Sequence, residues 1–166
     1  MNMKTRRRML EVLFDFASEP LYIYKGGEEV FQNCTHRSET YQGLLGATYD
    51  VCSISFNNDY FSIESSNHQN ADDRIYYFYL DAARYKKVVV KVYTTYMEGE
   101  TRFGVFDHDG LKKNSFTEEN SKAIGLWIDG PREFEFDITE AKGTKILAFC
   151  MSSNYCNPMI YEIRME

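Results

Sequence analysis

Trp127, Asp107 and Asp109 are the side chains whose types best suit ligand recognition. Trp127 is the only tryptophan among the 166 residues, and an indole offers a broad apolar surface for stacking. Carboxylates accept hydrogen bonds from hydroxyl groups. If Trp127 is exposed beside Asp107 or Asp109, a sugar ring could stack on the indole while its hydroxyls bond the carboxylates. If Trp127 is buried, it is a core residue instead.

The chain around Trp127 is expected to form a strand over residues 123–128. Period-two alternation places Ile124, Leu126 and Ile128 on one face and Trp127 on the other. That arrangement leaves the stacking hypothesis open.

Motifs for catalysis or metal binding are not evident. The stretch Asp107–Gly110 resembles part of a calcium loop, but Val105 stands where the EF-hand pattern needs an acid, so we expect a turn. His36, His68 and His108 are too far apart in sequence to form a zinc-ligand pair. The sequence contains no Cys-x-x-Cys, phosphate loop or G-x-S-x-G turn. We therefore predict no enzymatic activity, no metal and no cofactor.

The four cysteines, Cys34, Cys52, Cys150 and Cys156, are expected to be buried thiols. The apolar run 9–16 is interrupted by acids and does not resemble a signal peptide, so a reducing compartment is expected. Cys150 and Cys156 flank a predicted hairpin turn, and a disulfide between them is the alternative. Cys52 lies on the inward face of its expected strand, which disfavours a nucleophilic role.

Charge is distributed unevenly along the chain. The net charge is -6, yet Lys4, Arg6, Arg7 and Arg8 lie in the first ten residues without an acid. The acidic remainder disfavours binding to a phosphate backbone, so we expect no nucleic-acid partner. No stretch approaches the roughly 20 apolar residues of a membrane-spanning helix, so no membrane partner is expected.

Residues 76–96 are expected to form a strand, a corner and a second strand. β-branched and aromatic residues alternate with period two on both sides of the corner 81–85. The unit recurs over 134–151, with its corner at 139–143. Two such units indicate the two halves of an antiparallel sandwich.

The fold class predicted from these units is all-β: an antiparallel two-sheet β-sandwich of jelly-roll or galactose-binding-like type. The expected core residues are Phe78, Leu80, Val88, Val90, Val92, Phe134, Phe136, Ile138 and Ile163.

The N-terminal segment is expected to contain a short helix. Met9, Val12, Leu13 and Phe16 share one helical face, and Pro20 ends the segment. We expect two parts, a basic amphipathic segment 1–19 and a sandwich domain 20–166. The helix either docks on the domain or joins copies of the chain into a homo-oligomer.

Other segments divide into hairpins and polar loops. Turns are expected at 25–28 and at 57–59, since Gly and Asn tolerate left-handed backbone conformations. Residues 35–50 are expected to be loop with one edge strand, and 111–120 a surface loop. The closing strand 159–166 should alternate strictly, with Met159, Tyr161, Ile163 and Met165 on one face.

The tyrosines Tyr77, Tyr79 and Tyr93 fall on the faces opposite the expected core. We expect the N-terminal segment or the second sheet to cover them. The alternative is an exposed aromatic face that stacks on sugar rings or binds a protein.

Two motifs support a resemblance to a known family. Pro20–Glu29 resembles the "P-L-Y-L-Y-x-x-G-x-E" opening of tail and minor structural proteins of phages of Firmicutes, in which an Arg-rich helical segment often precedes, as Arg6–Leu10 does here. The strand–corner–strand units around Asp81 and Ile138 are similar to the "D-L-S-x-Y-x-K-I" units of the C-terminal lectin-like sandwiches of such proteins. After Glu29, the family's Gly-Gly-Trp step is replaced here by Thr35-His36-Arg37.

The resemblance implies a non-enzymatic structural or adsorption component of a phage or prophage particle. Its expected location is the virion, and its expected partners are other virion subunits or a host-surface glycan. One alternative is a carbohydrate-binding module of a bacterial glycan-degrading system. Another is a small intracellular interaction domain in the cytoplasm.

Overall fold

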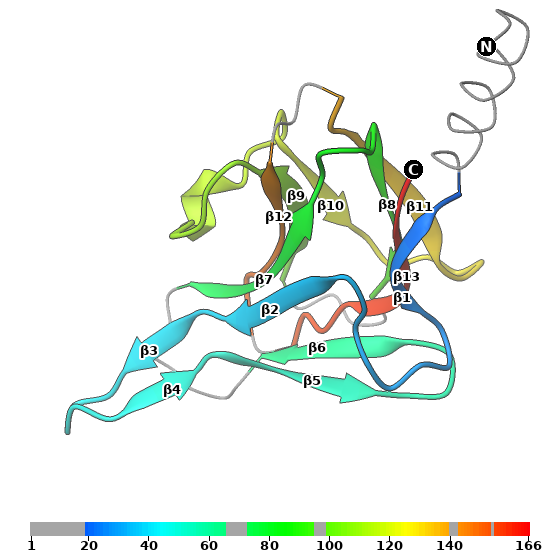
Figure 1. Cartoon of the computed structure of the whole chain (residues 1–166). Helices are drawn as coiled ribbons and strands as arrows, with labels where there is room; N and C mark the ends of the chain where they lie inside the picture. The colour runs from blue at the N-terminus through cyan, green and yellow to red at the C-terminus, as the bar shows by residue number, and fades with distance from the viewer. Residues whose placement is uncertain (1–18, 66–72, 95–98, 140–142, 154) are drawn as a thin grey trace, which may run out of the picture.

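The computed structural model describes residues 19–65, 73–94, 99–139, 143–153 and 155–166, which form an antiparallel two-sheet β-sandwich (Figure 1). The predicted fold class is thereby confirmed. The helix expected over residues 6–18 lies outside the described residues, and the division into 1–19 and 20–166 stays a prediction.

Sheet A has the strand order β11-β8-β13-β6-β5, with β1 paired to β13. Its strands are β1 (Leu21–Lys25), β5 (Cys52–Phe56), β6 (Phe61–Ser65), β8 (Lys87–Tyr93), β11 (Arg132–Asp137) and β13 (Met159–Met165). Sheet B has the order β10-β9-β12-β7-β2. Its strands are β2 (Cys34–Ser38), β7 (Arg74–Asp81), β9 (Thr101–Phe106), β10 (Ser121–Ile124) and β12 (Thr144–Met151).

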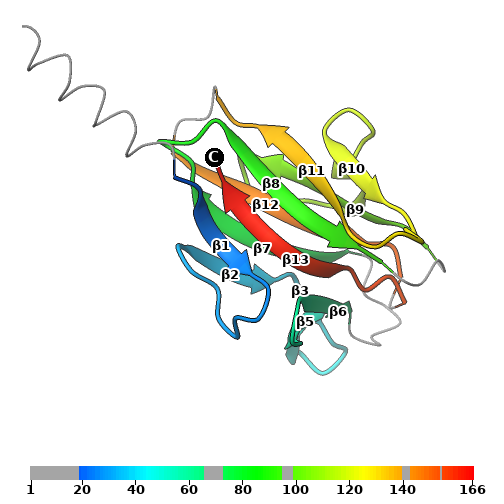
Figure 2. The ribbon, with the colours of Figure 1, turned by 90° about the vertical axis from the view of Figure 1, so that its right-hand side faces the viewer.

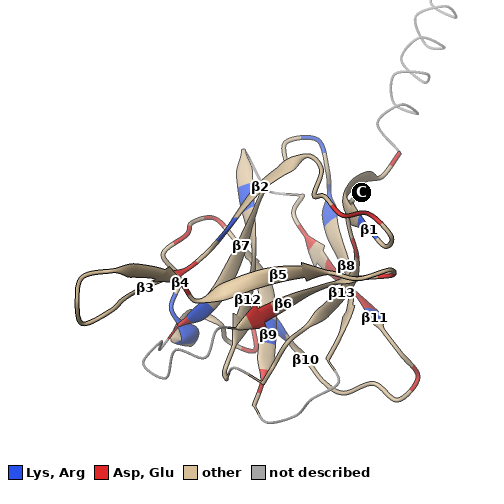
Figure 3. Cartoon of the chain, turned by 90° about the horizontal axis from the view of Figure 1, so that it is seen from below, with Lys and Arg blue, Asp and Glu red and all other residues tan. Residues whose placement is uncertain are grey.

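Two smaller elements complete the described chain. The hairpin of β3 (Thr40–Gln42) and β4 (Thr48–Asp50) projects from the body of the sandwich (Figures 1 and 3). A 3-10 turn, η1 (Lys113–Ser115), lies in the loop that follows β9. The expectation for residues 35–50, a loop with one edge strand, was therefore incomplete. β2 is the edge strand, and its single covered face explains its polar sequence.

Both strand–corner–strand units are confirmed, and each corner carries the chain from one sheet to the other. β7 of sheet B leads to β8 of sheet A, whereas β11 of sheet A leads to β12 of sheet B. The units run against each other, because β7 pairs with β12 and β8 pairs with β11. At the corners the Ala82 amide donates to the Gly143 carbonyl at 3.2 Å, and the Ile138 amide donates to the Lys86 carbonyl at 2.7 Å.

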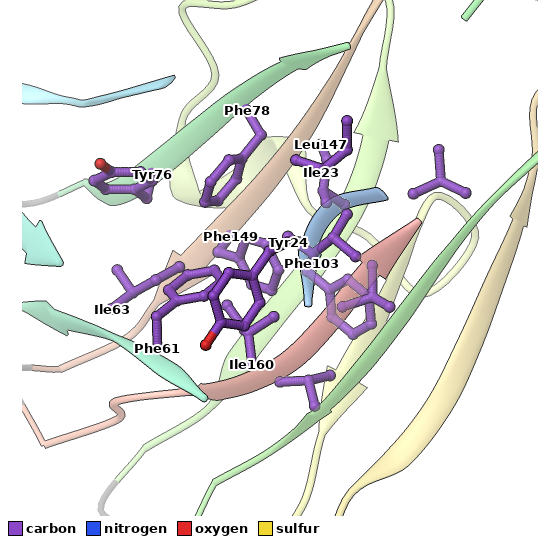
Figure 4. Packing of buried hydrophobic residues seen from close by; sticks show 14 of the residues in the cluster. Ile23, Tyr24, Phe61, Ile63, Tyr76, Phe78, Phe103, Leu147, Phe149 and Ile160 are labelled. Carbon is purple, nitrogen blue, oxygen red and sulfur yellow. The ribbon is translucent and has the colours of Figure 1, made fainter. Parts of the chain in front are cut away.

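The core between the sheets combines aliphatic side chains with a cluster of aromatic rings (Figure 4). Phe61 and Ile160 from sheet A lie opposite Phe78, Phe103 and Phe149 from sheet B. The rings of Phe103 and Phe149 stack with centroids 5.3 Å apart. All these side chains are fully buried, the state in which apolar area contributes most to stability.

Seven of the predicted core residues are buried, namely Phe78, Leu80, Val88, Val90, Val92, Ile138 and Ile163. Phe134 and Phe136 are the exceptions: both are half-buried and pack edge-on against Phe103, with centroids 5.2 Å and 5.3 Å away. They lie on β11, an edge strand of sheet A, and an edge leaves side chains partly uncovered.

The loop after β9 covers the outer face of sheet B. Leu111 and Phe116 are only 2% and 7% exposed and pack in a second apolar cluster with Ile75, Tyr77 and Ile146. The surface loop predicted over 111–120 is present and mostly exposed, but the burial of Leu111 and Phe116 was not predicted. Tyr77 is covered as expected, but by this loop rather than by the N-terminal segment or the second sheet.

Gly104 on β9 lies directly beside the backbone of this loop. A Cβ atom at Gly104 would lie 2.4 Å from the Asn120 carbonyl oxygen, so the backbone would have to move. We predict that Gly104→Ala lowers the free energy of unfolding by about 1–3 kcal/mol, measured by urea denaturation. Gly125→Ala is the matched control, because a Cβ there meets no atom within 4 Å. Equal effects of the two substitutions would contradict the close approach.

Candidate functional site

A β-bulge at Tyr161 shapes the outer face of sheet A. Ile160 pairs with Val92, and Glu162 pairs with Lys91 on the neighbouring strand β8. Tyr161 is therefore an extra residue between two pairs. Such a bulge redirects side chains and is frequent beside functional sites.

The bulge overturns the strict alternation expected for the closing strand. Alternation groups Tyr161 with Ile163 and Met165 on the core face. In the structure Ile160, Ile163 and Met165 are buried, while Tyr161 is half-buried and contacts the ring of Tyr93. The extra residue lets apolar side chains on both sides of the bulge enter the core while Tyr161 turns outward.

Three tyrosines form a continuous aromatic row, which we call the tyrosine face: Tyr60, Tyr161 and Tyr93. The centroid of the Tyr161 ring lies 5.3 Å from that of Tyr60 and 5.7 Å from that of Tyr93, and the latter pair is stacked at 23°. Burial, and next a hydrogen bond with Tyr93, raise the pKa of Tyr161 above its ordinary value. All three rings are half-buried, so each is held by neighbours and still presents surface.

Each tyrosine comes from a different part of the chain. Tyr60 precedes β6, Tyr93 ends β8, and Tyr161 is the bulge residue of β13. Figure 2 views strands β1, β8, β11 and β13 of sheet A from outside, and among the described segments none crosses in front of them. The tyrosine face thus lies on an open sheet surface.

A polar pocket of about 280 Å³ adjoins the tyrosine face. Tyr60 forms one wall, and Tyr155, which is 53% exposed, forms another. The Ser62 hydroxyl donates to the Glu64 carboxylate at 3.2 Å. The remaining lining residues supply hydroxyl, amide and thioether groups: Ser55, Asn57, Asn157 and Met159. Aromatic rings beside hydrogen-bonding groups suit a ligand with both apolar and hydroxylated faces.

The other half of the outer face carries an ion-pair network centred on Arg164. Its guanidinium donates to Glu166 at 2.6 Å and to Glu133 at 3.2 Å, and also contacts Glu162. Lys87 joins the network through Glu166, at 3.0 Å. Hydrogen bonds from Arg164 and then Lys87 hold the pKa of Glu166 below its ordinary value. The network fixes charged side chains beside the tyrosine face.

The structure does not bring Trp127 together with the two aspartates. β10 ends at Ile124, which pairs with Thr101 at the start of β9. Trp127 therefore lies beyond that end, whereas Asp107 follows the last residue of β9, about 20 Å from Thr101 along the strand. The strand expected over 123–128 is shorter than predicted, ending at Ile124.

Trp127 is half-buried, with one ring face occupied. The Arg132 guanidinium lies 3.6 Å from the centroid of the indole, and Phe134 lies 6.2 Å away. Leu126 and Ile128, expected to share one face with Ile124, are exposed, whereas Ile124 is buried. The indole thus packs at the margin of the core, and its ligand-binding role stays a prediction.

Asp109 lies beside an aromatic residue, but that residue is Tyr79. Arg37 donates to Asp109 at 2.9 Å and to the Tyr79 hydroxyl at 2.8 Å, and that hydroxyl donates to Asp109 at 3.1 Å. Bonds from Arg37 and then Tyr79 lower the pKa of Asp109. Asp107 forms an ion pair with Lys145. These contacts tie the loop after β9 to sheet B.

All four cysteines are free thiols, so Cys150 and Cys156 are not joined. Burial raises the pKa of Cys34 to about 11 and that of Cys52 to about 12, which disfavours the nucleophilic thiolate. In the described residues, no group of three His, Cys, Asp or Glu could hold a metal ion. No described helix is long and apolar enough to cross a membrane.

Proteins of known structure match this chain in fold, but no protein family or curated protein matches it in sequence. No family model matches the chain, and no curated protein does. A mutant of CBM29-2, a family 29 carbohydrate-binding module, aligns over 90% of this chain and 92% of its own, with a TM-score of 0.57 and 9% identity. CBM29_1, a family 29 carbohydrate-binding module from Piromyces equi, aligns over 89% of both chains, with a TM-score of 0.54 and 12% identity.

Mutants of CBM29-2 solved with mannohexaose and with cellulohexaose align with TM-scores of 0.53 and 0.52 and identities of 9% and 8%. They cover 89% of this chain and 90% and 89% of their own. At these identities the likeness establishes a shared β-sandwich fold.

The ion-pair network predicts a pH dependence. The folded pKa of Glu166 lies below its ordinary value of 4.5, so its ion pairs stabilise the fold above that pH. The stabilisation is lost as the pH falls through the folded pKa. We predict that Glu166→Gln lowers the free energy of unfolding at neutral pH by about 1 kcal/mol or less and reduces its decline in acid, measured by urea denaturation across pH. Glu118→Gln, outside the network, is the control, and matching curves for the two variants would contradict the assignment.

Proposed function

We propose that this chain is a non-catalytic carbohydrate-binding domain that holds an oligosaccharide on the tyrosine face. The observation that carries the proposal is the row of contacting rings Tyr60, Tyr161 and Tyr93 on a sheet surface that no described segment crosses. Sugar rings present an apolar face of C–H groups that packs on aromatic rings. The fold shared with carbohydrate-binding modules supports the proposal.

The polar pocket next to Tyr60 would bind the hydroxyls of the sugar. Ser62 and Glu64 accept hydrogen bonds, and the amide of Asn157 can both donate and accept. Glu162 and Glu133 lie in the adjacent ion-pair network. Because carboxylates on the face repel anions, the proposed ligand is a neutral glycan.

The proposed biological setting is a phage or prophage particle, where the domain would contact a host-surface glycan. The resemblance of Pro20–Glu29 and of the two strand–corner–strand units to phage tail proteins supports this setting. Mass spectrometry of particles induced from the source organism tests it, since a virion component should copurify with the tail proteins. The rival setting, a glycan-degrading system, predicts hydrolase genes beside this gene.

Binding to the tyrosine face predicts a specific loss on substitution. Calorimetric titration with mannohexaose and cellulohexaose, the ligands of the aligned modules, should show binding of at least one of them. Tyr161→Ala should weaken it roughly tenfold or more, because the central ring of the row is lost. Tyr49→Ala removes an exposed tyrosine of the hairpin and should leave affinity unchanged.

Two outcomes would contradict the proposal. One is wild-type affinity in a folded Tyr161→Ala variant, judged by circular dichroism. The other is failure of the wild-type protein to bind either hexasaccharide or any member of a neutral glycan array. Quenching of Trp127 emission together with unchanged affinity of Tyr161→Ala would locate the ligand at Trp127 instead.

A further inference from the structure

The tip of the β3–β4 hairpin exposes two adjacent leucines. Leu44 and Leu45 are each 99% exposed, and Figures 1 and 3 show the hairpin projecting from the sandwich. These side chains add nothing to the described core. Exposed apolar groups on a protruding element mark a surface that binds a partner.

The hairpin holds the leucines in an ordered turn. The Gly43 amide donates to the Ala47 carbonyl at 2.8 Å, and the Gly46 amide donates to the Gly43 carbonyl at 2.9 Å. Gly46 has a φ of +80°, which a residue with a side chain rarely adopts. Tyr41 and Tyr49 pair across the two strands below the turn. An ordered tip loses less conformational entropy when it binds.

The charge around the tip restricts the partner. Glu39 and Asp50 flank the hairpin, the sequence from Ser38 to Asp73 contains no Lys or Arg, and Figure 3 shows no basic residue on the hairpin. Anionic membranes and nucleic acids attract basic surfaces, so neither suits this end of the molecule. A partner that is both apolar and basic would complement it.

We propose that Leu44 and Leu45 of one copy dock against the N-terminal segment 1–18 of a second copy. That segment contains Lys4 and Arg6–Arg8 without a neighbouring acid, followed by apolar residues at helical spacing. In this segment a basic cluster is joined to an apolar stripe. The basic and apolar groups of this segment therefore complement the acids that flank the hairpin and the leucines at its tip.

The chain enters the sandwich far from the hairpin tip. The described chain begins at Glu19, beside β1, and the hairpin tip lies at the opposite end of the sandwich (Figure 1). A contact between the N-terminal segment of one copy and the hairpin of another is head-to-tail. Such contacts build rings when the rotation closes and filaments when it does not. This inference does not depend on glycan binding.

Sedimentation velocity of the full chain over a range of concentrations tests the contact. The wild-type protein should self-associate, and the Leu44→Ser/Leu45→Ser double variant should associate at least about tenfold more weakly. Ile128→Ser is the matched control, because Ile128 is fully exposed on another loop, and it should associate like the wild type. The leucines bury nothing in the described core, so the double variant should keep the wild-type circular dichroism and unfolding midpoint.

A charge reversal tests the identity of the partner segment. The Arg6→Glu/Arg7→Glu/Arg8→Glu variant should lose association to the same extent as the leucine variant, and wild-type association should weaken as salt rises. A wild-type protein that stays monomeric at all concentrations would overturn the proposal. So would association that survives either variant, or cosedimentation of the wild type with neutral phosphatidylcholine vesicles that the leucine variant abolishes.

Discussion

The burial of β7 and β12 on both faces determines which surface of this sandwich remains open. One face of each strand meets the core between the sheets, and the other carries Ile75, Tyr77 and Ile146 beneath Leu111 and Phe116. Strands that are apolar on both faces need a cover on both sides, and the loop after β9 supplies it. The Arg37–Asp109–Tyr79 contacts then hold that loop in place. Among the described residues, the outer face of sheet A is the broad sheet surface left for a ligand.

The sandwich could be predicted from the sequence because its signals are local. Alternation around Phe78 and Val90 depends only on neighbouring positions, and burial of those side chains follows from period two. The repeat of the strand–corner–strand unit even indicated two halves. The sequence pattern did not indicate to which of the two sheets each strand belongs. That assignment depends on long-range pairing, such as Asp81 with Thr144 and Lys87 with Asp137.

The candidate site was largely beyond prediction, and the reasons are physical. Tyr93 was expected on an outer face and lies there. Tyr161 was assigned to the core face, because a bulge adds a residue without changing the composition of a strand. Trp127 was judged by alternation within a strand that ends early, at Ile124. Asp109 does lie beside a tyrosine, but only the register of β2 on β7 brings Arg37 and Tyr79 to it.

The proposed hairpin contact would raise the avidity of the molecule for glycans that each tyrosine face binds weakly. A row of three half-buried tyrosines offers limited area, and small open sites of this kind bind single chains modestly. Copies joined head-to-tail through Leu44 and Leu45 would present one tyrosine face per copy along a common array. Binding at a second face then becomes intramolecular, and avidity rises without new contacts, provided that the spacing of faces matches that of the glycans. The hairpin and the tyrosine face lie on different surfaces, so occupation of one leaves the other accessible.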